Sequence, residues 1–177
     1  MQNFRKKFIF GIFLLPVLAF ATLAQYENAG KLNAWTTGKV QRKHENETVA
    51  DSLCKIRVAK QKGFDRVVFE FDKGKPEYVI QYLPSNIYSS EAGDEEIKIS
   101  GNVFMQISIY GMPQMEDLPC KLQSYEKGKL NLRAVRQIKE EVWFEGIRDF
   151  LIGVKAKKPF RIQELASPSR LVIDFKH

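Results

Sequence analysis

Apolar and polar residues alternate with a period of two along most of the chain after residue 52. In 66–71, Val67, Phe69 and Phe71 fall on one face, as the half-buried strand of a layered β-protein requires. Glycine and proline residues separate the alternating runs. The pattern predicts strands at 53–60, 66–71, 78–83, 103–110, 132–145, 148–156, 160–165 and 170–175. Many short strands divided by turn signals favour an all-β sandwich or barrel.

One of these runs, 132–145, fits both a helical period and a strand period. Val135, Ile138 and Val142 have helical spacing, and a strand period fits the same residues less well. Aromatic and β-branched residues surround the run, and its predicted neighbours are strands. We therefore predict a strand over 132–145.

The chain begins with a segment typical of a secretory signal peptide. Basic residues at 5–7 precede an apolar run, and small residues close it, so residues 1–24 are predicted to be removed after Ala21 or Ala24. The alternative is an uncleaved membrane anchor. The apolar stretch from Phe8 has 17 residues and contains Pro16, which is short for a spanning helix of about 20 residues.

Residues 25–52 are polar and show neither a helical nor a strand period. This composition predicts a linker between the signal segment and a folded domain over 53–177. Its one large apolar residue, Trp35, either packs back onto the domain or lies in a free tail.

Charge narrows the choice of partners only slightly. The 177 residues include 28 basic and 21 acidic side chains, a formal net charge of +7. Residues 1–24 carry three basic and no acidic groups, so the charge without them is +4. Export argues against nucleic acid as a partner and leaves anionic polymers of the cell envelope. A membrane is expected as a partner only through an uncleaved signal segment.

The two cysteines, Cys54 and Cys120, would lie in a compartment where disulfides persist. We expect a bridge between a strand and a loop, because Cys54 opens an alternating run and Cys120 follows Leu118 and Pro119. The alternative is two buried free thiols, since cysteine packs as a small apolar residue.

Two segments at the ends of the domain carry a family resemblance. GFDRVVFEF at 63–71 and PFRIQELASPSRLVIDF at 159–175, with FEGIRDFLIGVKAKKPFRI at 144–162 between them, resemble the AMIN-like family. That family is similar to the AMIN domain of N-acetylmuramoyl-alanine amidases and of some secretins. The resemblance implies a two-sheet β-sandwich, a location in the bacterial envelope (periplasmic or extracellular), and a non-catalytic role in binding or targeting, with peptidoglycan as the associated polymer.

Aromatic residues and arginines are the candidates for ligand binding. Tyr78 and Tyr82 share one strand face, and Trp143 would point outward if its neighbours point inward. Exposed rings can stack on sugars, whereas the other sheet, a loop or the linker would cover them in the alternative arrangement. Arg66 and Arg170 offer a guanidinium fork to a carboxylate.

Those arginines also have a structural interpretation. Leu171, Ile173 and Phe175 are expected to face the core, and Asp174 the opposite side. Asp174 would then pair with Arg66 or Arg170 across neighbouring strands.

Lysines form a small basic cluster near Pro159, together with Arg161. The lysines are Lys155, Lys157 and Lys158. Such a cluster is usually a solvated loop, but it could contact an anionic polymer, and salt would weaken that contact.

Candidate catalytic chemistry is sparse. His44 lies in the predicted linker and His177 at a terminus expected to fray, so neither is placed for a triad. No zinc-hydrolase spacing or phosphate-binding glycine loop occurs, and we predict no metal and no cofactor. The first hypothesis is an exported, non-catalytic module that binds peptidoglycan or another anionic envelope polymer. The second is an accessory protein that docks an envelope protein, and the third a hydrolase of an envelope polymer.

Overall fold

A computed structural model describes residues 32–45, 47–50, 52–84, 97–112, 118–123, 125 and 127–177. The predicted signal peptide and the first part of the predicted linker, residues 25–31, lie outside the described residues. The described residues include no helix that is long and apolar enough to cross a membrane.

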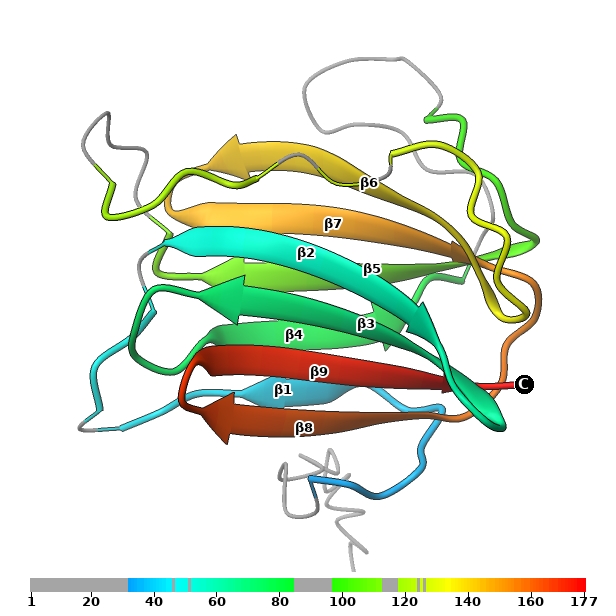
Figure 1. The fold of residues 1–177 in the computed structure, drawn as a ribbon, viewed down its shortest axis with the longest axis horizontal. Helices are drawn as coiled ribbons and strands as arrows, with labels where there is room; N and C mark the ends of the chain where they lie inside the picture. Colours follow the sequence, from blue (N-terminus) through cyan, green and yellow to red (C-terminus); the bar gives the residue numbers. More distant parts are fainter. Residues whose placement is uncertain are drawn as a thin grey trace, which may run out of the picture.

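Nine strands in two antiparallel sheets form the described structure (Figure 1). One sheet has four strands in the order β2-β3-β9-β8, and the other has five in the order β1-β4-β5-β7-β6. The strands are β1 (Val40–Arg42), β2 (Leu53–Lys60), β3 (Phe64–Phe71), β4 (Glu77–Tyr82), β5 (Val103–Tyr110), β6 (Val135–Phe144), β7 (Ile147–Val154), β8 (Phe160–Ala166) and β9 (Ser169–Lys176). The predicted all-β, two-sheet sandwich is confirmed, and the ambiguous run at 132–145 contains strand β6.

The core lies between the two sheets and is filled by the inward residues of the alternating strands. Val67, Phe69 and Phe71 of β3 are buried, as their spacing predicts. Phe69 meets Phe150 of β7 across the sandwich with ring centroids 5.2 Å apart in an edge-to-face arrangement. The period-two pattern therefore identified the correct core face of this sheet.

The predicted linker needs a correction. Within 25–52, β1 pairs with the edge strand β4, with Val40 opposite Ile80. Just before it, Thr36 exchanges two backbone hydrogen bonds of 2.8 Å with Phe160 on the edge strand β8. Residues 33–42, here called the N-terminal strap, thus pair with the edge of each sheet in turn. The segment is too short and too polar to show a strand period, yet its backbone groups satisfy the two open edges.

Residues 48–50 are also part of the sandwich. Gly74, in the turn between β3 and β4, has a φ of +68°, and a Cβ there would lie 2.6 Å from the carbonyl oxygen of Thr48. Lys75 donates its backbone N–H to that same Thr48 oxygen, and Ala50 is fully buried. This contact is possible only because Gly74 lacks a side chain.

A disulfide ties the loop before β6 to the edge of the four-stranded sheet. Cys54 of β2 is bonded to Cys120, with Cα atoms 5.4 Å apart, so the predicted bridge is confirmed. Gln123 donates its backbone N–H to the Cys54 carbonyl, and Leu122 packs against the core. The bridge therefore holds a covering loop over the sheet edge.

Replacing both cysteines by alanine is expected to lower the free energy of unfolding by roughly 4 kcal/mol. The bridge closes a loop with a sequence separation of 66 residues, and cross-linking that loop restricts the unfolded chain. Urea denaturation of the oxidised protein and the double variant measures the difference. Equal midpoints and slopes would contradict the expectation, and reduction of the wild type gives an independent comparison.

Candidate functional site

The predicted aromatic surface on β4 is the core face of the strand. Tyr78 is fully buried and donates its hydroxyl to Glu164 of β8 over 2.8 Å. Burial raises the pKa of Tyr78 strongly, because the phenolate would be desolvated and would lie beside the Glu164 carboxylate. Tyr78 therefore bridges the sheets and offers no exposed ring, which corrects the expectation of a binding role on the surface.

Tyr82 is half-buried at the end of the same strand. Its hydroxyl donates to the backbone carbonyl of Lys158 over 2.7 Å, and burial raises its pKa to about 12. Its ring packs edge-to-face against Phe160 at 5.8 Å. The side chain holds the loop before β8 against the five-stranded sheet, so its visible role is to position that loop.

The predicted orientation of Trp143 is wrong. A register shift between Glu140 and Trp143 inserts one extra residue in β6, so the alternation reverses beyond it. Trp143 packs against the core and donates its indole N–H to the Met112 carbonyl over 2.5 Å, while Phe144 is 63% exposed. Sequence alternation alone does not reveal a bulge.

The predicted cross-strand charge pair is present and larger than expected. Asp174 of β9 accepts two hydrogen bonds from Arg66 of β3, at 2.7 and 2.9 Å, and one from Arg161 of β8 at 2.8 Å. The three residues stand in one row across three neighbouring strands. The bonds to Asp174 raise the pKa of Arg66, so the guanidinium stays charged.

Aromatic rings cover this row on the outer face of the sheet. Asp174 has no exposed surface, whereas the side chains of Arg66 and Arg161 remain 30% and 25% exposed. The Arg161 guanidinium lies 4.8 Å from the ring centroid of Trp35 and 5.0 Å from that of Phe64. The covered row therefore contains two cations and one anion.

Arg170 lies on the same outer face, since it pairs in register with Glu70, four residues along the strands from the row of Asp174. It donates to the Pro168 carbonyl at 3.2 Å. Of the five residues predicted to bind a ligand, the structure thus brings Arg66 and Arg170 to one face. The other three lie on core faces.

A second feature begins at Asp65, which precedes Arg66 and points into the sandwich. One oxygen of this fully buried carboxylate accepts the backbone N–H groups of Ala134 and Val135, at 2.5 and 3.1 Å. Its other oxygen lies 2.9 Å from Nε2 of His177. The carboxylate thereby fixes the start of β6 and the last residue of the chain at the same point.

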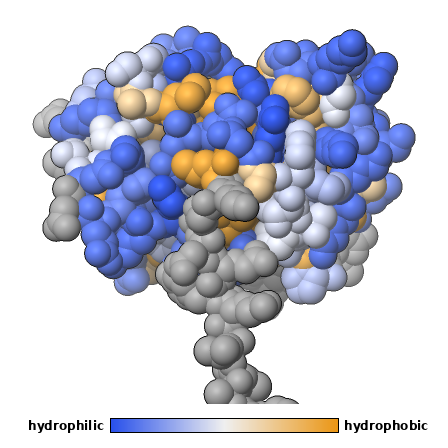
Figure 2. All heavy atoms as spheres, turned by 90° about the horizontal axis from the view of Figure 1, so that it is seen from below, coloured by the Kyte–Doolittle hydropathy of each residue, from blue (hydrophilic) through white to orange (hydrophobic). Residues whose placement is uncertain are grey.

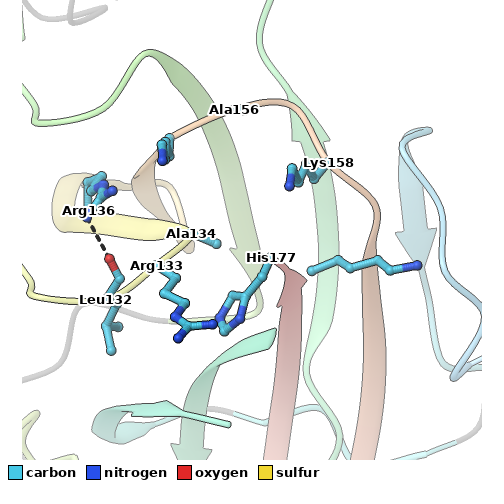
Figure 3. Close-up of a pocket in the computed structure, with 9 residues that line it drawn as sticks. Leu132, Arg133, Ala134, Arg136, Ala156, Lys158 and His177 are labelled. Atoms are coloured by element: carbon cyan, nitrogen blue, oxygen red, sulfur yellow. Dashed lines mark hydrogen bonds between the residues drawn. The ribbon is translucent and has the colours of Figure 1, made fainter. Parts of the chain in front are cut away.

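Two partners of Asp65, Ala134 and His177, line a basic cleft of about 450 Å³ (Figure 3). It is bordered by the segment before and into β6, the loop before β8, and the last two residues. None of the residues that line it, all within the described part of the chain, is Asp or Glu. The lining residues are Leu132, Arg133, Ala134, Arg136, Lys155, Ala156, Lys158, Lys176 and His177.

The residues of the predicted basic cluster near Pro159 do not form one site in the structure. Lys155 and Lys158 line the cleft. Lys157 instead lies over the Tyr82 ring, at 5.7 Å from its centroid, and Arg161 belongs to the Asp174 row. Sequence reasoning therefore found part of the cleft.

The remaining basic residues of the cleft were missed. Arg133, Arg136, Lys176 and His177 come from chain segments far from the lysines in sequence. In the sequence, each of them is only a basic residue near one end of a predicted strand. Such residues are common on protein surfaces, so their positions did not indicate a shared cleft.

Both histidines are held more firmly than expected. His44 is buried, with its Nε2 atom 3.4 Å from a carboxylate oxygen of Glu164, rather than lying in a linker. His177 is fixed by Asp65 and donates its backbone N–H to Gly63. No group of three or more His, Cys, Asp or Glu side chains suited to a metal ion occurs among the described residues.

The family model of the AMIN-like domain matches residues 51–177, and the chain belongs to this family. The match includes both segments that carry the family resemblance, those containing Arg66 and Asp174. Comparison with curated proteins and with solved structures found no match. Membership indicates, in general terms, an envelope-associated binding module.

Asp174→Asn is expected to lower the free energy of unfolding by about 2–4 kcal/mol, because it leaves two neighbouring guanidinium groups without their shared counter-charge. Glu70→Gln is the matched control. Glu70 pairs with Arg57 at 2.6 Å on the same face, but both side chains are partly exposed, at 23% and 49%. The control should therefore cost less than about 1 kcal/mol. Equal losses in thermal or urea unfolding would contradict the assignment.

Asp65→Ala is expected to lower the free energy of unfolding by about 2–4 kcal/mol, because the buried N–H of Val135 and the partly buried N–H of Ala134 lose their acceptor. Hydrogen exchange should then accelerate at Ala134 and Val135 before it does so in the centre of β6. Lys60→Ala, an exposed change near the same hairpin, provides the control. Unchanged exchange at the two amides would show that Asp65 does not fix this segment.

Proposed function

We propose that this protein is an exported, non-catalytic module that binds an anionic polymer of the cell envelope, such as peptidoglycan, through the basic cleft. Export through residues 1–24 is part of the proposal. The observation that carries it is the cleft itself. Five Lys or Arg side chains and one His line about 450 Å³, and none of its lining residues in the described part of the chain is Asp or Glu.

The cleft brings five Lys or Arg side chains together without an Asp or Glu among its lining residues. Some cations elsewhere on the surface lie beside a carboxylate, as in Arg57–Glu70 at 2.6 Å and Lys75–Glu47 at 2.6 Å. Around the cleft, Arg136 donates to the carbonyl of Leu132, a neutral partner, so this hydrogen bond does not cancel the guanidinium charge. A concave surface lined by one sign of charge concentrates polyanions.

The cleft also has a fixed shape. Asp65 anchors Ala134 and His177 on two of its borders, and Tyr82 anchors the carbonyl of Lys158 on the third. A pre-formed site loses less conformational entropy when it binds. The anchoring groups therefore support binding by a rigid cleft.

Cosedimentation with purified sacculi tests the proposal. We expect the mature protein to pellet at low salt and to be released as ionic strength rises, because exposed charges are screened over about 10 Å at 0.1 M salt. The double variant Lys155→Glu, Lys158→Glu should remain in the supernatant at all salt concentrations.

The matched control is Lys73→Glu, which changes charge at the opposite end of β3 from the cleft, combined with a second charge change at exposed Lys43. This control has the same net charge as the cleft variant and should still pellet. Equal release of the two variants would point to net charge rather than the cleft. Absence of the wild type from the pellet, with crosslinking in cells to one envelope protein, would support protein docking instead.

A further inference from the structure

Trp35 stands beside the basic cleft on the outer face of the four-stranded sheet. Lys176, which lines the cleft, has its ammonium group 5.8 Å from the centroid of the Trp35 ring. The ring is 38% exposed, which makes it one of three large hydrophobic side chains exposed among the described residues. On the side of the molecule seen in Figure 2, apolar surface forms small areas within strongly hydrophilic surroundings. An accessible indole is therefore next to a site for anions.

The position of this ring is fixed by its backbone. Asn33 donates its N–H to Ile162 and Thr36 exchanges two hydrogen bonds with Phe160, all at 2.8 Å. Trp35 thus lies between two points at which the strap is bonded to β8. The indole also meets Phe64 edge-on, with ring centroids 6.3 Å apart. A ring held on both sides loses little freedom when a ligand stacks on it.

The chemistry around the ring favours a ligand with both apolar and anionic parts. An aromatic face carries negative quadrupole density, which attracts the C–H groups on the flat side of a pyranose ring. The Arg161 guanidinium and the Lys176 ammonium lie over the ring, 4.8 and 5.8 Å from its centroid, and the Arg161 side chain is 25% exposed. Beside the 38% of Trp35 that stays exposed, these cations attract a carboxylate or phosphate. A sugar that carries an anionic group meets both requirements at once.

We propose that Trp35 is a stacking platform for a sugar ring and that the ligand of the cleft is an anionic polysaccharide, with Lys176 shared by the platform and the cleft. The inference rests on the proposed function, and it adds the class of ligand. Trp35 also lies over Arg161, a partner of the buried Asp174, and the variants below separate stacking on a ligand from this structural contact.

Binding is measured with three probes: a hyaluronan oligosaccharide, poly-L-glutamate of matched carboxylate number, and an uncharged chitin oligosaccharide. Trp143→Phe leaves Trp35 as the only tryptophan of the chain after residue 24, so its fluorescence reports on the platform. We expect hyaluronan to change that fluorescence and poly-L-glutamate to bind without the change. Chitin oligosaccharide should change it only at much higher concentration.

Trp35→Leu keeps an apolar cover over Asp174 but removes the aromatic face. It should weaken hyaluronan binding roughly threefold to tenfold, which is the range expected for one aromatic contact, and leave poly-L-glutamate binding unchanged. Trp35→Phe should restore most of the loss. Phe144→Ala removes the most exposed aromatic ring of the described residues, far from the cleft on β6, and should leave both affinities unchanged.

The outcomes separate the two proposals. If neither polyanion binds with a salt-dependent affinity, the basic cleft is not a polyanion site and the proposed function fails. If both polyanions bind and Trp35→Leu weakens them equally, or weakens neither, the cleft stands and the sugar platform is overturned. Melting temperatures of all variants show whether a lost affinity reflects a lost fold.

Discussion

A buried carboxylate holds the two sheets together at the end of the sandwich that contains the basic cleft. Asp65 comes from β3 in one sheet. Its carboxylate oxygens accept hydrogen bonds from two backbone N–H groups at the start of β6 in the other sheet, and from the imidazole of His177. A carboxylate without exposed surface is strongly unfavourable unless hydrogen bonds replace its hydration. Three donors meet that requirement here. The same bonds set the positions of two borders of the cleft, so core stability and cleft shape depend on one residue.

The residue after Asp65, Arg66, contributes to the outer face of the same sheet. Arg66 points outward because side chains alternate along a strand, and there it joins Arg161 in binding Asp174. Consecutive residues of the segment GFDRVVFEF therefore anchor the cleft and the outer row of charges. Asp174 comes from the closing segment SRLVIDF, so the two segments that carry the family resemblance meet in space. Their charged residues have a structural role, which explains why a binding residue could not be inferred from them alone.

Edge protection links the fold to the proposed platform. The strap covers the β8 edge and then extends the sheet of β4, while the disulfide holds a loop at the β2 edge. Covered edges prevent pairing with other chains. Because the strap must pass over β8 beside Phe160, it carries Trp35 to the outer face next to Lys176. The same segment that closes the sandwich thus supplies the ring for the proposed sugar contact.

The amino-acid sequence by itself predicted eight of the nine strands and the core face of β3, because these depend on a period of two. It also reduced the disulfide and the partner of Asp174 to short lists, from which the structure selects the Cys54–Cys120 bridge and Arg66. It could not place Trp143, since a single extra residue in β6 reverses the alternation without changing composition. It also could not reveal β1 or the cleft. The three-residue strand β1 forms because it can pair with the otherwise open edge of β4. The basic residues of the cleft come from three segments that are separate in sequence. Tertiary packing decided those features, because they arise from groups that become neighbours only after the sheets close.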